Sequence, residues 1–265
     1  MFEKITSFQN PRLKLIKKLR DKKEREREQR FVIDDTRDLE RALVCGYRVD
    51  YCFYTPMLAN GQFIPGLQKQ QVYEVSPEMM EKVSYRANPG AFLAVMHDKP
   101  VRDYRQLSEI VDQPVLGMVN LQKPGNIGAL LRTADATGFK GILLIDTLLD
   151  PYNPNIIRSS TGACFLDNIY YVSTVQAVDF FKQNHYQVLS AHLAGESNLF
   201  KVQMADRCAI ILGTEDIGLD ESWIQHSDEL VKIPMMGELS DSLNVSVSGA
   251  IFMYEALRQR LAHRV

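Results

Sequence analysis

The sequence predicts an α/β protein with a mostly parallel sheet, and three observations lead to this prediction. Short apolar runs alternate with amphipathic helical patterns along the 265 residues. The run Gly-Ile-Leu-Leu-Ile at residues 141–145 is almost continuously apolar, as a parallel strand buried on both faces should be. Glycine and proline punctuate most boundaries between runs. Such alternation builds a parallel sheet that carries helices on both faces.

Residues 1–97 are expected to form a small α/β domain. Asn10 before Pro11 is a helix cap with a proline in the first turn, so a helix begins there. A second helix is expected over residues 36–45, and a third begins after the cap residue Ser76. The expected strands of this domain are residues 31–33, 49–54, 72–75 and 92–96.

Residues 98–113 form a polar stretch bounded by prolines, which we interpret as a linker. Leu107, Ile110 and Val111 give part of it the spacing of a short helix. The linker separates the first domain from a second domain, residues 114–265.

The second domain repeats the alternation of strands and helices. Asn126 occupies the cap position of a helix expected over residues 127–137. Another helix is expected over residues 174–184, and the last one runs from Val245 to the C-terminus. The expected strands are residues 115–119, 141–145, 169–172, 188–192, 208–212 and 230–233.

Composition excludes several classes of protein. The hydrophobic fraction of 45% and the charged fraction of 24% are globular values, and no apolar stretch is long enough for a membrane helix. The N-terminus shows no signal-peptide core and the four cysteines are scattered, so a reduced, cytoplasmic protein is expected. Scattered histidines and the absence of HExxH predict no metal site. GxGxxG and GxxxxGKS/T are also absent, which disfavours the usual nucleotide folds.

Positive charge concentrates near the N-terminus. Residues 4–30 contain 11 Lys and Arg against 4 Asp and Glu, a balance of +7, whereas the whole chain carries −2. The charges of residues 24–30 fit a solvated helix with ion pairs. The one-sided excess before them favours contact with a polyanion. The residues expected to contact a nucleic acid are Arg12, Lys14, Lys17, Lys18, Arg20, Lys22 and Lys23.

Three loops gather polar and small residues at residues 126–132, 212–219 and 233–250. Each has a plain interpretation as a helix cap or a βα turn. The glycines at both ends of the second loop would let the backbone approach a ligand closely. The third loop collects hydroxyl and amide groups where a helix leaves unpaired backbone donors.

In this order the loops resemble the three motifs of the SpoU-type, TrmH-like branch of the SPOUT methyltransferases, which methylate the ribose 2′-oxygen of RNA. The matching segments are Asn-x-Gly-x-x-x-Arg from residue 126, Gly-x-Glu-x-x-Gly from residue 213, and Ile-Pro-Met…Ser-Leu-Asn-Val-Ser from residue 233. Through Ser7-x-x-Asn10-Pro11, the basic helix and Phe31-Val32, the N-terminal part more loosely resembles the ribosomal-protein-like substrate-binding domain of this family.

The resemblance implies a parallel-sheet domain tied in a deep trefoil knot, preceded by a small α/β RNA-binding domain. It implies S-adenosylmethionine as cofactor and a homodimer formed through the C-terminal domain. The implied cofactor contacts are Leu193, Gly213, Thr214, Gly218, Ile233, Met235 and Leu243. The implied active-site residues are Asn126, Arg132, Glu215, Ser242 and Asn244.

The roles of these residues stay open at this point. Arg132 would be the base proposed in the family or, since an arginine is protonated at neutral pH, a bidentate clamp on the adjacent phosphate. Glu215 would fix Asn126 or Arg132. Ser242 and Asn244 would orient the ribose or the cofactor carboxylate.

The expected substrate is large-subunit (23S) rRNA, because the extra N-terminal domain suits a large folded RNA. One alternative is the same chemistry on tRNA. An alternative of another class is a non-catalytic RNA-binding or ribosome-assembly factor. The chain departs from many relatives at Lys123, since these carry Asp-Pro before the motif asparagine, and this reverses the charge near the expected substrate entrance.

Overall fold

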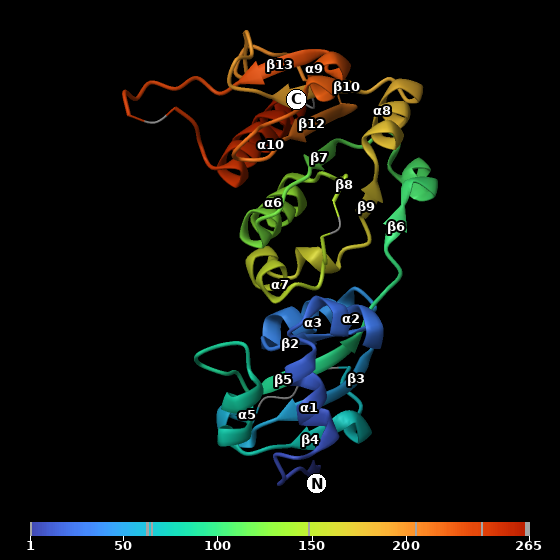
Figure 1. Cartoon of the computed structure of the whole chain (residues 1–265), viewed down its shortest axis with the longest axis vertical. Helices are drawn as coiled ribbons and strands as arrows, with labels where there is room; N and C mark the ends of the chain where they lie inside the picture. The colour runs from blue at the N-terminus through green and yellow to red at the C-terminus, as the bar shows by residue number, and fades with distance from the viewer. Residues whose placement is uncertain are drawn as a thin grey trace. The chain divides into compact units, whose positions relative to one another are not determined.

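The computed structural model describes residues 2–61, 64, 66–147, 149–204, 206–239 and 241–262. The chain forms two compact units (Figure 1). Unit 1 comprises Met1–Pro100 and Asp150–Leu166, and unit 2 comprises Val101–Leu149 and Asp167–Val265. The sequence places residues 150–166 in the second domain, whereas in the structure they complete the first unit.

Unit 1 contains a five-stranded mixed sheet. Its strand order is β1-β4-β3-β5-β2, in which β1 and β3 run parallel to β4, while β5 is antiparallel to β3 and β2. The strands are β1 (Glu3–Lys4), β2 (Arg30–Ile33), β3 (Val49–Tyr54), β4 (Val72–Glu74) and β5 (Phe92–His97).

Two helices of unit 1 begin with the side-chain caps that the sequence predicts, at Asn10 and Ser76. Asn10 accepts a hydrogen bond from the backbone N–H of Arg12 at 2.9 Å, and Ser76 accepts one from Met79 at 3.3 Å. The helices are α1 (Pro11–Lys18), α2 (Lys22–Glu28), α3 (Thr36–Val44), α4 (Pro56–Ala59), η1 (Lys69–Gln71), α5 (Pro77–Val83), α7 (Pro154–Ser160) and η3 (Ala163–Phe165).

Aromatic packing joins residues 150–166 to the rest of unit 1. The ring of Tyr152 stacks on that of Phe31, with centroids 4.2 Å apart and an interplanar angle of 7°. Phe165 lies 5.2 Å from Tyr47, and the buried Arg25 donates from Nε to Asp150 Oδ2 at 2.7 Å. These partners are far apart in the sequence, so local periodicity does not predict their pairing.

Unit 2 is built on an eight-stranded sheet in which all neighbours run parallel. The strand order is β11-β13-β10-β12-β7-β8-β9-β6. The trefoil knot stays a prediction, because strand order alone does not define how a segment threads a loop. The strands are β6 (Arg102–Asp103), β7 (Val115–Val119), β8 (Gly141–Ile145), β9 (Ile169–Val172), β10 (Gln187–Ala191), β11 (Ser197–Asn198), β12 (Cys208–Leu212) and β13 (Glu229–Lys232).

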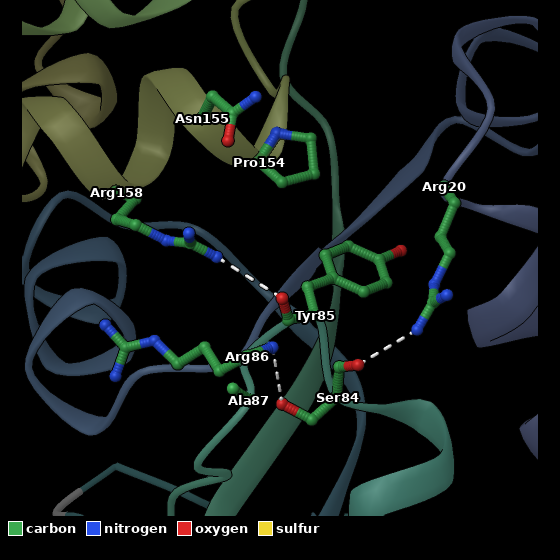
Figure 2. A pocket seen from close by; sticks show the side chains of 8 residues that line it. All are labelled: Arg20, Ser84, Tyr85, Arg86, Ala87, Pro154, Asn155 and Arg158. Atoms are coloured by element: carbon green, nitrogen blue, oxygen red, sulfur yellow. Dashed lines mark hydrogen bonds between the residues drawn. The ribbon is translucent and has the colours of Figure 1, made fainter.

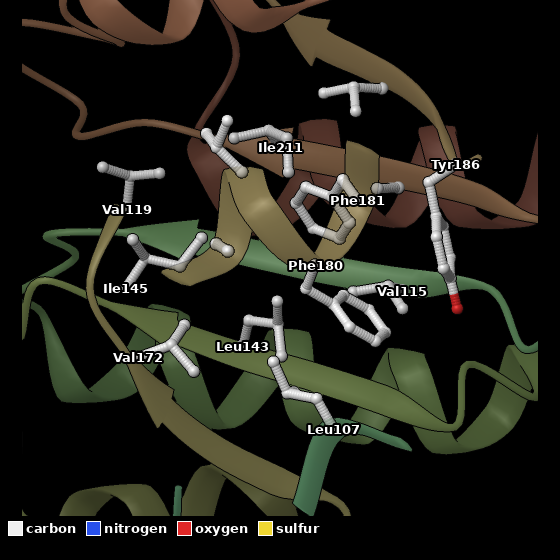
Figure 3. Close-up of a cluster of buried hydrophobic side chains, with 14 of the residues drawn as sticks. Leu107, Val115, Val119, Leu143, Ile145, Val172, Phe180, Phe181, Tyr186 and Ile211 are labelled. Carbon is white, nitrogen blue, oxygen red and sulfur yellow. The ribbon is translucent and has the colours of Figure 1, made fainter. Parts of the chain in front are cut away.

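Helices cover both faces of this sheet. Ile211 faces the cluster that contains Phe180 and Phe181 of α8 (Figure 3), whereas its neighbour Leu212 faces α10 at Gly249. The helices of unit 2 are η2 (Tyr104–Ile110), α6 (Pro124–Thr137), α8 (Thr174–Gln183), α9 (Glu221–His226) and α10 (Val245–Ala262). Within the described ranges, no helix has the length and apolar character needed to cross a membrane.

Two segments differ from expectation. Helix α6 begins at Pro124, so Asn126 lies in its first turn and the predicted cap position is wrong; proline favours the first helical position. Residues 102–110, expected in the linker, form β6 and η2. Two of the apolar residues that gave this stretch a helical spacing, Leu107 and Ile110, are buried in the core of unit 2.

Candidate functional site

A cavity of about 340 Å³ lies at the carboxyl ends of β10, β12 and β13, beside the start of α10. Parallel strands place the loops that follow them at one edge of the sheet, which is where open α/β sheets bind ligands. The volume falls within the roughly 300–1,000 Å³ that is typical of small-molecule sites. The seven residues expected to contact the cofactor all line this cavity: Leu193, Gly213, Thr214, Gly218, Ile233, Met235 and Leu243.

The loop after β12 is closed by its own backbone. Thr214 N–H donates to Gly218 C=O at 3.1 Å, and Gly218 N–H donates to Thr214 C=O at 3.0 Å. A Cβ at position 213 would lie 2.3 Å from the carbonyl carbon of Gly218, and Gly218 itself has a φ of +75°. This tight turn therefore requires glycine at both positions.

A polar cluster joins three loops at Glu215. Its Oε1 accepts a hydrogen bond from Asn244 Nδ2 at 2.8 Å and another from Asn126 Nδ2. Asn244 Nδ2 also lies 3.2 Å from Asn126 Oδ1. Three of the five predicted active-site residues, distant in sequence, therefore contact one another directly.

Lys123 completes the cluster, and the sequence does not predict this role. Its Nζ forms an ion pair with Glu215 Oε2. The pKa of Glu215 is lowered, chiefly by the hydrogen bond from Lys123, and that of Lys123 is raised by the same bond. Glu215 is consequently an ionised acceptor at neutral pH. The sequence did show that Lys123 stands where many relatives carry an aspartate, and this reversal of charge could have indicated a role for the residue.

Glu215 also lines the cavity, as does Ser242. Asn244 is fixed from its other side, because its Oδ1 accepts from the backbone N–H of Ser246 at 3.0 Å and from the Ser246 hydroxyl at 2.6 Å. The carboxylate thus connects the cavity with the two amides at the starts of α6 and α10.

Arg132 is not part of this cluster. It is exposed on α6, and among the described residues its guanidinium group has no hydrogen-bond or ion-pair partner. Of the two roles considered for Glu215, the geometry therefore shows the contact with Asn126 and does not show one with Arg132.

The residues expected to bind RNA lie on α1, on α2 and between them. Lys14, Lys17, Lys18 and Lys23 are exposed. The Arg12 guanidinium lies 4.2 Å from the centre of the Tyr73 ring, Arg20 donates to Ser84 C=O at 2.9 Å, and Lys22 pairs with Glu26 at 3.5 Å.

The ion-paired helix expected over residues 24–30 is present in part. Arg27 pairs with Glu24 and Glu28, at spacings of three and one residues rather than the four that was expected. Arg25 is an exception, because it is buried and pairs with Asp150 rather than facing solvent. Within the part of the chain described, no three His, Cys, Asp or Glu side chains gather as a metal ion would require.

Comparisons with known proteins agree with this geometry. The model of the SpoU rRNA Methylase family matches residues 113–254, and that of the MRM3-like substrate binding domain matches residues 10–94. An uncharacterized tRNA/rRNA methyltransferase of Synechocystis sp. is 30% identical over 97% of this chain and 94% of its own. The 23S rRNA (guanosine(2553)-2′-O)-methyltransferase RlmP of Bacillus subtilis is 28% identical over 95% of this chain and 98% of its own.

A solved structure of similar extent is the AdoMet-bound rRNA methyltransferase from Sinorhizobium meliloti. It matches with a TM-score of 0.83 at 25% identity, and covers 97% of this chain and 98% of that chain. The likeness therefore extends over both units.

Proposed function

The chain belongs to the SpoU rRNA Methylase family, and from this premise we propose that it methylates the 2′-oxygen of a ribose in large-subunit (23S) rRNA with S-adenosylmethionine as methyl donor. One observation carries the proposal. Glu215 lines the cavity at the strand ends and at the same time holds the amides of Asn126 and Asn244. The cofactor cavity and the groups that would position the ribose are thus adjacent.

The cavity suits S-adenosylmethionine in chemistry as well as in size. Leu193, Ile233 and Leu243 offer apolar surface for an adenine ring, and the two glycines of the β12 loop bring backbone groups close. Thr214 and Ser242 offer hydroxyl groups for the polar end. When bound, the cofactor supplies a methyl group on a sulfonium.

Asn126 and Asn244, which Glu215 holds beside the cavity, would orient the ribose 2′-hydroxyl toward the methyl group of the bound cofactor. Glu215 acts here as a positioning residue, since Lys123 stabilises its ionised form and both amides occupy Oε1. Arg132 has neither a carboxylate nor another protein acceptor within the described residues, so its guanidinium fork is available to clamp the neighbouring phosphate.

Two features support rRNA as substrate. The relative from Bacillus subtilis, which this chain matches over nearly its full length, is named for 23S rRNA. Unit 1 carries the match to a substrate-binding domain and presents the exposed lysines of α1. Binding of a large folded RNA accounts for a second unit beside the methyl-transfer unit.

The proposal includes a homodimer and a cytoplasmic location. Helix α10 buries Phe252 and Met253 within its own unit, and it also exposes Val247, Tyr254 and Leu261. That outer apolar surface suits packing of unit 2 against a second copy. The three buried cysteines are unpaired, as is usual for a reduced compartment.

The test is transfer of labelled methyl from S-adenosylmethionine into separated rRNA and tRNA that lack the modification, followed by mapping of the labelled ribose. Label at one rRNA position is expected, and Asn126→Ala or Arg132→Ala should each lower the single-turnover rate about 100-fold or more. Label in tRNA instead would retain the chemistry and overturn the substrate. Bound RNA and cofactor without any transfer would favour a non-catalytic assembly factor.

A further inference from the structure

Unit 1 contains a cleft of about 490 Å³ that the methyl-transfer chemistry does not use. Figure 2 shows its lining, which comes from the connection between α1 and α2, the segment after α5, and α7. None of the lining residues is acidic and three are arginines. The residues are Arg20, Ser84, Tyr85, Arg86, Ala87, Pro154, Asn155 and Arg158.

Arg20 and Arg158 approach one short stretch of backbone from opposite sides (Figure 2). Arg20 Nη2 donates to the carbonyl oxygen of Ser84 at 2.9 Å, and Arg158 Nη2 lies 3.5 Å from that of Tyr85. A guanidinium has five N–H donors, so each contact leaves most of its donors unused. Both arginines are exposed, and within the described residues neither lies within ion-pair distance of a carboxylate.

Arg86 differs from the other two arginines. It points away from Arg20 in Figure 2, and its Nη1 pairs with Asp35 at 2.7 Å. The positive charge of the cleft that is not compensated therefore comes from Arg20 and Arg158, which makes the cleft a site for an anion rather than an internal salt-bridge network.

Buried contacts hold both walls of the cleft in place. Arg25, which is 5% exposed, donates to the carbonyl oxygens of Leu19 and Arg20 at 2.6 and 2.8 Å, and it also binds Asp150, four residues before α7. Asp34 accepts from the backbone N–H of Tyr85 at 2.9 Å. The Arg25 guanidinium thus binds both the backbone at Arg20 and the segment that leads to Arg158.

The aromatic ring in the cleft is not available for a base. Tyr85 is already engaged, since its hydroxyl donates to Ile16 C=O at 3.2 Å and its ring lies 4.9 Å from the Arg20 guanidinium. The free groups are guanidinium donors and the exposed side-chain amide of Asn155. These groups can donate hydrogen bonds to phosphate and ribose oxygens, which account for most protein–nucleic acid hydrogen bonds.

We propose that the cleft between Arg20 and Arg158 binds phosphate groups of the RNA backbone, and this inference rests on the proposed function in taking RNA as the partner. One wall comes from residue 158, in the segment that interrupts the chain of unit 2, so the site is not a property of the basic N-terminal helices alone.

The experiment uses the full-length protein and an unmodified 23S rRNA transcript. RNA affinity is measured between 50 and 300 mM salt, roughly spanning the range where phosphate contacts dominate, for wild type, Arg158→Ala, Arg158→Lys and Arg20→Gln/Arg158→Ala. Arg48→Ala is the matched control, because Arg48 is exposed, lies in unit 1 and is outside the cleft. Inorganic phosphate is titrated in parallel.

Arg158→Ala should weaken RNA binding about tenfold and lower the salt slope by about 0.7–0.9, and the double variant should do so about twice as much on a logarithmic scale. Arg158→Lys should recover part of the affinity, and Arg48→Ala should match wild type. Unchanged affinity and slope in the double variant would overturn the proposal. So would saturable binding of free phosphate that both cleft substitutions abolish without affecting RNA, which would identify a small-anion site.

Two further readings separate this inference from the proposed function. Thermal unfolding of each variant shows whether the loss of affinity reflects loss of fold. Arg158→Ala is the safer substitution because, within the described residues, the only side-chain hydrogen bond of Arg158 is the 3.5 Å contact with the carbonyl oxygen of Tyr85. S-adenosylmethionine affinity should not change. A wild-type protein that binds RNA through the cleft but transfers no methyl group would refute the enzyme and leave the cleft intact.

Discussion

At the residue scale, one carboxylate organises the candidate site. Glu215 lies in the loop after β12, yet its three side-chain partners are in the turn that starts α6 and in the residue before α10. The identities of Asn126, Glu215 and Asn244 could be read from motifs. Their mutual contacts could not, because a motif gives spacing along one segment and says nothing of which side chains from different loops meet.

The tight packing of the loop after β12 predicts that a side chain larger than glycine at position 213 disturbs the cofactor cavity. In Gly213→Ala the added methyl would lie 2.3 Å from the Gly218 carbonyl carbon, so the closed turn has to open. S-adenosylmethionine affinity, measured by calorimetry, should fall at least tenfold. Gly237→Ala is the control, since nothing lies within 4 Å of the added atom there, and it should bind normally. Normal binding by Gly213→Ala would show that the turn is not part of the cofactor site.

The buried Asp38 carboxyl predicts how the stability of unit 1 depends on pH. It is 3% exposed, and burial, with a smaller contribution from Asp35, raises its pKa from 3.8 to about 6, against the opposing effect of Arg37, Arg86 and Arg41. The folded state therefore holds this proton more tightly than the unfolded chain. The associated stability is complete below pH 4 and is lost as the pH rises through 6.

Asp38→Asn should accordingly stabilise unit 1 by about 3 kcal/mol at pH 8 and by much less at pH 4.5. Denaturant unfolding at the two pH values measures the difference. An equal effect at both would mean that the Asp38 carboxyl titrates normally in the fold.

At the element scale, strands and capped helices could be predicted where the residues of one segment alone define the element. The cap at Asn10, the strand at residues 49–54 and the strand at residues 141–145 needed only local chemistry. The short β6 and the helix α7 needed partners. Their sequences are polar and brief, and their placement depends on β9 and on the aromatic side chains of unit 1.

The exposed lysines of α1 predict how RNA affinity depends on ionic strength. Lys14, Lys17 and Lys18 are exposed on it. If four or five basic residues of α1 and its neighbourhood contact phosphates, the logarithm of RNA affinity should fall with a slope near −3 against the logarithm of salt, at about 0.7 per single-strand contact. Replacing the three lysines with glutamine should reduce that slope by about 2. A flat response in the wild type would remove this helix from the RNA-binding surface.

At the scale of the whole molecule, the sequence order and the structural units do not coincide. The first unit is completed by Asp150–Leu166, which follow forty-nine residues, Val101–Leu149, that belong to the second unit. Local patterns correctly indicate two α/β units. The boundary was placed at the polar stretch bounded by prolines, residues 98–113. Such a stretch does not indicate that a later segment of the chain packs into the first unit.

A fragment of residues 1–100 should therefore fail to fold properly. It lacks the ring of Tyr152 that stacks on Phe31, and it leaves the buried Arg25 without its carboxylate, a loss of about 3–5 kcal/mol where a domain has only about 5–15. Circular dichroism and amide dispersion in NMR spectra measure the outcome.

Joining residues 150–166 to the fragment through a short Gly/Ser linker should restore the fold. Lys99 N–H already donates to the Tyr152 hydroxyl at 3.0 Å, so the two ends are close. A well-folded fragment 1–100 without the added segment would contradict this account.

The split first unit also has a consequence for synthesis. When Pro100 has been translated, 66 residues remain up to and including Leu166, which at about 5–20 residues per second is roughly 3–13 seconds. Until Asp150 and Tyr152 have been translated, Arg25 has no counter-charge and the Phe31 ring lacks its stacking partner, and Phe165, which packs on Tyr47, follows later still. The nascent chain should present this aromatic surface to chaperones on the ribosome, and it should lose affinity for them when Phe165 emerges.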